Sequence, residues 1–374
     1  MPVRESASTR NTFASTSSPL VAPHWRSLRH LRSVGLVSAA TLLTVGLVAG
    51  CGKTDDNSAS IVRTTTNIAG AGVVGVERDT SKACPLPSSP DSASGTKTVA
   101  HASGTSEVPA DPKRIVVLST SALDATCALG LWERVVGATT LAGPAPQPAY
   151  LGTGVVDIPS VGPVGDPDPA KIAELKPDLI IGPAADSSRY DALKGIAPTV
   201  LVGEENGWQA TFTGFAEAMD RKSAGARALD DYRTAAKDAG VAANAALTEA
   251  SVIRFEPNVI QVQGGNSFAA QVLGDAGVQR PQPQRGDSFD VTSLSSQDDR
   301  NRIEGDLIFL MFDGKDGLDY GKSIMKGDNW KQLAAVSDRR EFAVDDTIWH
   351  GSGITAARAL LDDVRNNLNG YVTD

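Results

Sequence analysis

The sequence predicts an α/β protein of two similar lobes, each with a central, mostly parallel sheet, joined by one backbone helix with a ligand cleft between the lobes. Short apolar runs alternate with helical segments along most of the chain, which is typical of parallel sheets covered by helices. The order helix, acidic residue, apolar strand occurs in both halves, as "ELKPDLIIG" and "RIEGDLIFLM". A long helical stretch separates the two halves.

The first 51 residues differ from the rest of the chain. Arg26, Arg29 and Arg32 precede the uncharged run "SVGLVSAATLLTVGLVAG", which ends next to Cys51. A basic region followed by an apolar region is typical of a secretory signal. The segment "LVAGC" resembles the lipobox of bacterial lipoproteins, in which the Cys is lipidated and becomes the mature N-terminus. The alternative is a transmembrane anchor, and both interpretations place the remaining chain outside the cytoplasmic membrane.

Composition and charge narrow the functional class. The chain has 374 residues, of which 41% are hydrophobic and 21% charged, as expected for a soluble globular protein of about two domains. Its net charge is −9, and residues 1–51 hold five Arg against one Glu, a net of +4, so the chain after residue 51 carries −13. This excess of negative charge disfavours binding to nucleic acids and electrostatic docking on anionic lipids.

The three cysteines predict one disulfide. If Cys51 is lipidated, Cys84 and Cys127 remain, an even number in a compartment where disulfides persist. We expect these two to be bonded. The alternative is that Cys127 is a small buried hydrophobic residue and that Cys84 is a free thiol.

The stretch "GAGVVG" at residues 70–75 spells G-x-G-x-x-G, the pattern of a dinucleotide-binding turn. That site requires a helix directly after the glycines, but Pro85, Pro87 and Pro90 follow and no helical periodicity is present. We therefore interpret residues 52–95 as a flexible linker between the signal peptide with its lipobox (1–51) and the first lobe.

Residues 96–207 form the predicted N-terminal lobe. Two short strands flank Gly104, and a buried strand at 115–118 leads into the helical segment "SALDATCALGLWE". The pattern then repeats as "RVVGATT" (strand), "DPAKIAEL" (helix), "DLIIGP" (strand), "SSRYDALKG" (helix) and "PTVLVG" (strand). Strand and helix alternate at the spacing of βαβ units.

Residues 208–248 are predicted to be helical, and residues 249–374 to form the C-terminal lobe. We expect the helix at 209–220 to be the rigid connection, with Phe212, Phe215 and Met219 on its apolar face. The second lobe is predicted from a strand or hairpin in "ASVIRFEPNVIQVQG", a helix in "SFAAQVLGDAG", strands in "EGDLIFLMF" and "EFAVDDTIW", and helices in "WKQLAAV" and "ITAARALLDDVRNNL".

Several stretches together resemble a known family. They are "EVPADPKRIVVL", "LKPDLIIG", "IAPTV" and "WKQLAAV…FAVDDTIWHGSGITAARALLDDV". Their order and spacing are similar to those of class III binding proteins of ABC importers, which carry iron-siderophores, haem or cobalamin, and especially to iron-dicitrate-binding (FecB-type) lipoproteins of actinobacteria. The resemblance spans residues 61–374. It implies a rigid connecting helix, little hinge motion on ligand binding, and no catalysis.

Candidate ligand-binding residues lie in loops that follow the carboxyl ends of predicted strands, where ligands bind in open α/β sheets. They are Ser119, Thr120, Tyr150, Pro163, Arg189, Tyr190, Asn266, Phe268, Arg285, Phe289, Phe312, Trp349 and His350. Aromatic rings suit the flat body of a siderophore or porphyrin, and Arg189 and Arg285 suit its anionic oxygens. Among the aromatic residues, Trp349 is the strongest candidate.

Three functional classes remain open at this stage. The first is a membrane-anchored protein that captures a ferric siderophore or haem for an ABC permease, with iron present only as part of the ligand. The second is a binding protein for another small ligand, or a cell-envelope interaction protein. The third is an extracellular enzyme, which the scattered histidines and the lack of catalytic and metal motifs disfavour. We expect no cofactor, no protein-bound metal and no nucleic-acid partner.

Overall fold

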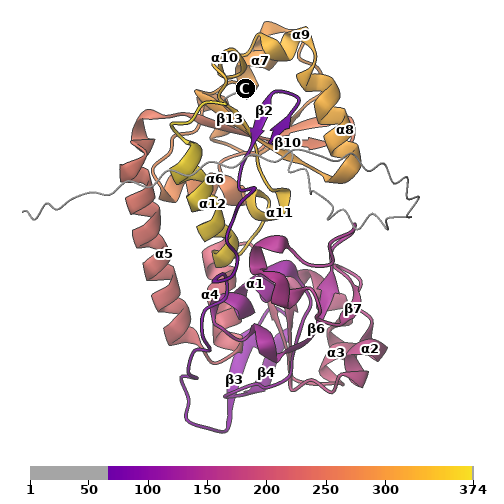
Figure 1. The fold of residues 1–374 in the computed structure, drawn as a ribbon. Helices are drawn as coiled ribbons and strands as arrows, with labels where there is room; N and C mark the ends of the chain where they lie inside the picture. The colour runs from indigo at the N-terminus through magenta and orange to yellow at the C-terminus, as the bar shows by residue number, and fades with distance from the viewer. Residues whose placement is uncertain (1–65, 373–374) are drawn as a thin grey trace, which may run out of the picture. The chain divides into compact units, whose positions relative to one another are not determined.

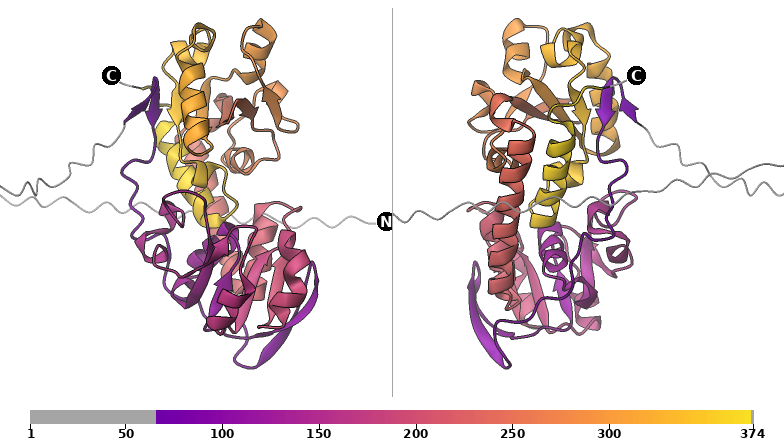
Figure 2. Two further views of the ribbon diagram at one scale, coloured as in Figure 1. Left: turned by 90° about the vertical axis from the view of Figure 1, so that its right-hand side faces the viewer. Right: turned by 60° about the vertical axis from the view of Figure 1, so that its left-hand side comes forward.

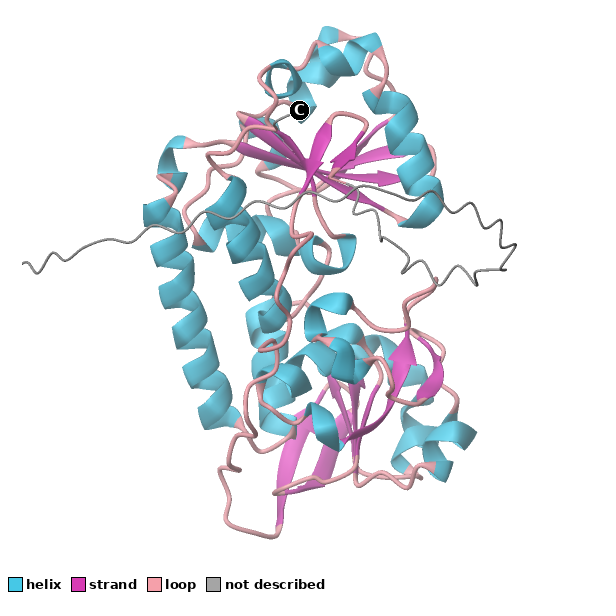
Figure 3. Cartoon of the chain, viewed as in Figure 1, coloured by secondary structure: helices cyan, strands magenta, loops and turns pink. Residues whose placement is uncertain are grey.

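The computed structural model describes residues 66–372, and these residues fold as two lobes within one compact unit (Figure 1). The expected signal peptide and Cys51 lie outside the described residues. Figure 3 shows a separate sheet in each lobe, with helices packed around both. The two-lobed α/β fold class is confirmed. None of the helices in residues 66–372 is long and apolar enough to span a membrane.

The N-terminal lobe contains a five-stranded, fully parallel sheet. The strand order is β7 (Ser160–Pro163), β6 (Val135–Thr140), β5 (Ile115–Val117), β8 (Leu179–Pro183) and β9 (Thr199–Val202). The central strands are continuous apolar runs because helices cover both faces of a parallel sheet. The helices are α1 (Thr120–Ala128), α2 (Pro169–Glu174) and α3 (Tyr190–Lys194). Four of these strands were expected from the apolar runs, whereas β7 was not predicted.

A β-hairpin extends this lobe away from the other one. Strands β3 (Thr96–His101) and β4 (Gly104–Pro109) pair in antiparallel register around the predicted turn at Gly104, whose φ is +139°. The hairpin packs against β9, where the Ser106 hydroxyl donates a 2.6 Å hydrogen bond to the Thr199 carbonyl. The two short strands expected around Gly104 are therefore confirmed.

The C-terminal lobe contains a seven-stranded mixed sheet. Its order is β1 (Asn67–Ile68), β2 (Ala71–Val73), β14 (Glu341–Ala343), β13 (Leu307–Phe312), β10 (Ala250–Glu256), β11 (Val259–Val262) and β12 (Phe289–Val291). Its helices are α6 (Phe268–Asp275), α7 (Gln297–Ile303), α8 (Gly314–Met325), α9 (Asp328–Lys331), α10 (Ala334–Ser337), α11 (Asp346–Trp349) and α12 (Ile354–Asn367). The central pair β10 and β13 is parallel, as in the other lobe.

Residues 66–95, which we call the N-terminal strap, are not the flexible linker that the sequence suggested. Strands β1 and β2 form a small hairpin, and β2 pairs in parallel with β14, so the strap completes the sheet of the C-terminal lobe. Gly70 turns the hairpin with φ +118°, and a Cβ atom there would lie 2.8 Å from Oε1 of Glu341. The glycines therefore serve a tight turn and close packing, and no nucleotide-binding helix follows them.

The strap then runs to the other lobe along α12 (Ile354–Asn367) (Figure 2). Nη2 of Arg78 donates a 2.6 Å hydrogen bond to Asp363, and Nη1 donates a 2.9 Å bond to the Ala359 carbonyl, both on α12. Cys84 is disulfide-bonded to Cys127 in α1, which confirms the expected pairing. The strap thus links the C-terminal sheet to the core helix of the N-terminal lobe.

The connection between the lobes is longer than the helix expected at 209–220. Helix α4 (Trp208–Ala218) covers the N-terminal lobe with the predicted apolar face of Phe212 and Phe215. Helix α5 (Lys222–Ala242) follows and extends beside both lobes in Figure 1. At its start Gly225 packs on Ala216, and near its end Gly240 packs on the carbonyl of Ala276, which follows α6. Helix α5 is therefore the connecting helix.

A buried carboxylate joins the lobes at a second place. Asp124 of α1 accepts 2.9 Å hydrogen bonds from the backbone N–H groups of Thr355 and Ala356 in the first turn of α12. The hydroxyl of Tyr150 donates a third bond of 3.1 Å to the same carboxylate. Burial raises the pKa of the Asp124 carboxyl, and these donated bonds oppose the rise. Asp124 thus caps a helix of the opposite lobe.

Candidate binding site

A cleft of about 580 Å³ lies between the lobes at the carboxyl ends of β5, β6, β13 and β14. The N-terminal lobe contributes Thr120, Leu141, Ala142 and Pro148. The C-terminal lobe contributes Arg254, Phe312, Asp313, Gly314, Asp346, Thr347, His350, Gly351 and Ser352. Strand ends of two facing sheets are where α/β proteins bind small ligands, and the size is typical of such sites. This cleft is therefore the candidate site.

Arg254 is the central charged group of the cleft. Its Nε and Nη2 atoms donate bonds of 2.7 and 3.1 Å to the two carboxylate oxygens of Asp346. Nη2 also donates a 2.9 Å bond to Asp313, and Nη1 donates a 3.0 Å bond to Glu256. These carboxylates raise the pKa of Arg254 although its partial burial alone would lower it. The guanidinium is held in one orientation by carboxylates that follow or belong to three neighbouring strands.

His350 stands beside this cluster on the same wall. Partial burial is the first cause that lowers its pKa, and the positive charge of Arg254 lowers it further. Asp346, Glu256 and Asp313 oppose this shift. The pKa of His350 therefore lies below its usual value of 6.5, and the imidazole is uncharged at neutral pH.

The remaining wall is largely apolar and neutral. Leu141, Ala142 and Pro148 line it from the N-terminal lobe, and Phe312 faces them from the end of β13. The ring of Phe312 stacks on Phe255 with centroids 5.6 Å apart, which fixes its position in the wall. The cleft thus combines an apolar contact surface with one cluster of charged groups.

Three of the sequence-predicted residues line this cleft, namely Thr120, Phe312 and His350. Phe312 ends β13, His350 follows the short helix α11, and Thr120 begins α1 shortly after β5, so all three lie at the carboxyl edges of the sheets. Ser119, the preceding residue to Thr120, is buried, and its hydroxyl caps α1 by accepting a 3.1 Å bond from the Ala122 N–H. Ser119 therefore stabilises the first turn of α1, which begins with Thr120.

The prediction for Trp349 is not met, because its indole is only 1% exposed. Strand β14 ends at Ala343, and Asp345 caps the short helix α11 by accepting a bond from the Thr347 N–H. This turn directs Trp349 into the core, where it packs on Phe309 and its Nε1 donates a 2.9 Å bond to Asp363. The next residue, His350, takes the place in the cleft that the sequence suggested for Trp349.

Tyr150 is also buried, at 3% exposure, and does not line the cleft. Its hydroxyl donates to Asp124, as described above, and burial together with that carboxylate raises the pKa of the phenol. Its role in this structure is to stabilise the junction of the lobes.

The other candidates of the N-terminal lobe lie away from the cleft lining. Pro163 is exposed at the end of β7. Arg189 donates a 2.8 Å bond to Asp166 and lies 3.9 Å from Asp186. Tyr190 packs edge-on against His101 of the β3–β4 hairpin, with ring centroids 5.2 Å apart. The segment after β8 thus turns toward the hairpin and not toward the cleft.

Four candidates of the C-terminal lobe lie near the other edge of the sheet. Asn266 is exposed in the loop before α6, and Phe268 packs edge-on against Trp208. Arg285 is exposed and donates to Glu249 and to the Arg280 carbonyl. Phe289 begins β12 with the guanidinium of Arg302 stacked 4.3 Å from its ring. They miss the cleft because β11 and β12 extend the sheet on the far side of β10.

Sequence reasoning missed Arg254, Asp313 and Asp346. Arg254 lies inside the apolar run "ASVIRFE", where a lone charge between buried residues was a usable signal. Asp313 and Asp346 follow strands of the same lobe closely, as do the residues that the sequence did identify. Their coupling to Arg254 depends on strand order, which the sequence does not display.

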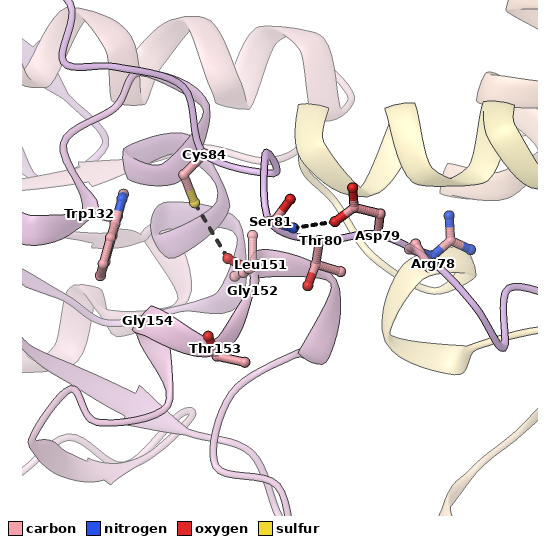
Figure 4. Close-up of a pocket in the computed structure, with 10 residues that line it drawn as sticks. All are labelled: Arg78, Asp79, Thr80, Ser81, Cys84, Trp132, Leu151, Gly152, Thr153 and Gly154. Carbon is pink, nitrogen blue, oxygen red and sulfur yellow. Dashed lines mark hydrogen bonds between the residues drawn. The ribbon is translucent and has the colours of Figure 1, made fainter. Parts of the chain in front are cut away.

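A second hollow, of about 540 Å³, lies between the strap and the loop at residues 151–154 (Figure 4). In it the Ser81 N–H donates a 2.9 Å bond to Asp79, and the Cys84 sulfur lies 3.4 Å from the Leu151 carbonyl. That sulfur is oxidised and has no hydrogen to donate, so the latter is a packing contact. This hollow lies away from the strand ends, and we favour the cleft between the lobes as the binding site.

Trp349→Phe provides a direct check of the structural role of the indole. We expect the variant to lose about 1–2 kcal/mol of unfolding free energy, because Asp363 loses a buried hydrogen bond while Arg78 still binds it. Ligand affinity should stay within about twofold of wild type, since the ring does not reach the cleft. Trp330→Phe is the matched control, because its Nε1 likewise donates to a buried carboxylate, that of Glu341. Chemical denaturation and ligand titration measure both effects; a tenfold loss of affinity in Trp349→Phe alone would contradict this placement.

The chain is similar in sequence and fold to known binding proteins. Residues 115–347 match the model of the periplasmic binding protein family. The "probable siderophore-binding lipoprotein YfiY" of Bacillus subtilis is 33% identical over 73% of this chain and 88% of its own length. The "Fe(3+)-citrate-binding protein YfmC" of the same organism is 28% identical over 70% of this chain and 84% of its own.

Among solved structures, that of Staphylococcus aureus SirA complexed with staphyloferrin B is similar, with a TM-score of 0.64 and 26% identity. It covers 73% of this chain and 99% of that one. The matched family consists of binding proteins and not of enzymes, as the sequence resemblance implied. On the family match and the identity to YfiY, the chain belongs to the periplasmic binding protein family.

Proposed function

We propose that this protein captures a ferric siderophore in the cleft between its lobes, outside the cytoplasmic membrane, and delivers it to an ABC permease. The observation that carries the proposal is the cleft itself, which joins the carboxyl ends of both sheets and presents apolar wall residues beside an oriented Arg254 cluster. Many ferric siderophores present carbon-rich surface as well as polar oxygens around the metal, and this wall offers contacts to both.

The relatives support this ligand class. YfiY is named a probable siderophore-binding lipoprotein, and the SirA structure holds staphyloferrin B. The name of YfiY as a lipoprotein also supports attachment of this chain to the membrane through a lipid on Cys51, as the "LVAGC" sequence suggests. Capture at the membrane surface raises the local concentration of the loaded protein near a permease.

Isothermal titration of the purified protein with a panel of compounds tests the proposal. The panel comprises a ferric tris-hydroxamate, a ferric tris-catecholate, ferric dicitrate, haem and cobalamin. At least one ferric siderophore should bind with a Kd of about 1 μM or tighter, and its iron-free form more weakly. Binding of haem or cobalamin alone would favour the other ligands of this class of importer, and no binding at all would reject the proposal.

The linked lobes predict little motion on ligand binding. Helix α5 is 21 residues long, or roughly 30 Å, and bending it would break backbone hydrogen bonds. The strap with its disulfide and the Asp124 cap of α12 connect the lobes at two further places. We therefore expect rotation of only a few degrees. Small-angle scattering with and without saturating ferric siderophore should give superimposable curves; a contraction typical of hinge closure would contradict this rigidity.

A further inference from the structure

We propose that the cleft selects ferric complexes that carry no net negative charge, as tris-hydroxamate chelates do, and discriminates against ferric citrate and tris-catecholates. This inference rests on the proposed capture of a ferric siderophore and defines the class of ligand that the same cleft accepts. It replaces the expectation that arginines recognise an anionic ligand.

The charge of the cleft wall carries the argument. Arg254 is the single Lys or Arg among the described residues that line the cleft, whereas Asp313 and Asp346 both line it. Glu256, which is 30% exposed at its side chain, also binds Arg254. One positive group is therefore surrounded by three carboxylates, and the cluster has an excess of negative charge.

The hydrogen bonds of Arg254 are already committed to these carboxylates. Of the five N–H groups of a guanidinium, the bonds to Asp346, Asp313 and Glu256 use four. The side chain is 11% exposed, so a ligand oxyanion has little access to it. Such an anion would also approach the carboxylates and desolvate them without a new partner.

Within residues 66–372, no second Lys or Arg lines the cleft to offset this excess, and Lys315, next to the lining residue Gly314, is paired with Asp319. The pKa of His350 is lowered, so its imidazole is neutral at pH 7. Arg189 and Arg285, the residues predicted to attract an anion, do not line the cleft and are paired with Asp166 and Glu249. The net charge of the whole chain, −9, repels anions at longer range as well.

The chemistry of the chelates determines which of them fits. A tris-hydroxamate balances the charge of Fe³⁺ and is neutral, and an additional ammonium group makes it cationic. Citrate and catecholate groups carry more negative charge than the metal neutralises. The apolar lining of Leu141, Pro148 and Phe312 suits the uncharged body of the first class.

The test compares affinities for ferrichrome (neutral), ferrioxamine B (cationic), ferric dicitrate and a ferric tris-catecholate at low and high salt. We expect both hydroxamates to bind at least about tenfold more tightly than either anionic complex. Salt should weaken the binding of ferrioxamine B and leave that of ferrichrome nearly unchanged, because screening acts on the charged ligand.

Asp313→Asn separates charge from shape. Asp313 is half-exposed, and its side chain binds Arg254 alone. The Asn side chain has a similar size, so the substitution removes one negative charge and keeps the shape of the wall. Ferric dicitrate should then bind about fivefold more tightly and ferrioxamine B about fivefold more weakly, with ferrichrome unchanged. Asp328→Asn, at an exposed position on α9 in the same lobe and outside the cleft lining, is the control and should change none of the three.

Two results would overturn the inference while leaving the proposed function intact. One is tighter binding of ferric dicitrate or the tris-catecholate than of either hydroxamate by the wild-type protein. The other is an Asp313→Asn variant that behaves like Asp328→Asn for both charged ligands. If none of the ferric complexes binds, the proposed function and this inference are both rejected.

Discussion

Replacing Asp124 by Ala should lower the free energy of unfolding by about 3–5 kcal/mol, the largest effect that we expect from a single side chain. The change removes the acceptor for two backbone N–H groups of α12 and for the Tyr150 hydroxyl, all of them buried. Unpartnered buried donors are costly because water does not reach them. Relief of the buried carboxylate charge offsets only part of this loss.

Asp168→Ala is the matched control for Asp124→Ala. Asp168 also accepts bonds from two backbone N–H groups at a helix start, those of Ala170 and Lys171, but its bonds are exposed and within one lobe. We expect a loss of about 1 kcal/mol there, as for ordinary helix caps. Denaturant unfolding followed by circular dichroism measures both variants. Equal losses would show that Asp124 is an ordinary cap and does not join the lobes.

Removing the Cys84–Cys127 disulfide should have the second large effect on stability. The bond closes a segment of 43 residues, for which the chain-entropy model gives about 4 kcal/mol. In a protein of this size that corresponds to roughly 6 °C in Tm. The double variant Cys84→Ser with Cys127→Ala suits the test, because Cys127 is fully buried and Cys84 is only half-buried.

Differential scanning calorimetry of the double variant, of wild type, and of wild type with reductant provides the measurement. The variant and the reduced wild type should melt together, below the oxidised wild type. Reductant should leave the melting of the variant unchanged, because no disulfide remains among the described residues. An oxidised wild type that melts with the variant would show that the strap is held by its other contacts alone, such as Arg78 with Asp363.

The central strands and the place of the cleft were predictable because they depend on local patterns. Continuous apolar runs such as "IVVL" and "LIFLMF" form buried parallel strands, and residues that follow them reach the carboxyl edge. Thr120 and Phe312 were found in this way. Element type follows from short-range sequence, and so does the position of a residue directly after a strand.

The sequence-based predictions failed where contacts between distant segments determine the local structure or the position of a side chain. Strands β1 and β2 have two and three residues, too few for a period, and they form because β14 offers an edge. Trp349 lies within the core because a capped turn of helix separates it from β14. Arg254 looked like part of a buried strand, and only the order of strands brings Asp313 and Asp346 to it.

The most direct measurement of the central claim uses variants that fill the cleft. Ala142→Trp and Ser352→Trp place an indole on opposite walls, one from each lobe, whereas Ala145→Trp places it at an exposed position of the same loop as Ala142, outside the cleft lining. Isothermal titration uses the ferric siderophore that binds the wild-type protein most tightly. Both cleft variants should lose at least about tenfold in affinity, and Ala145→Trp should stay within about twofold. Full affinity in both cleft variants would contradict capture of the siderophore between the lobes.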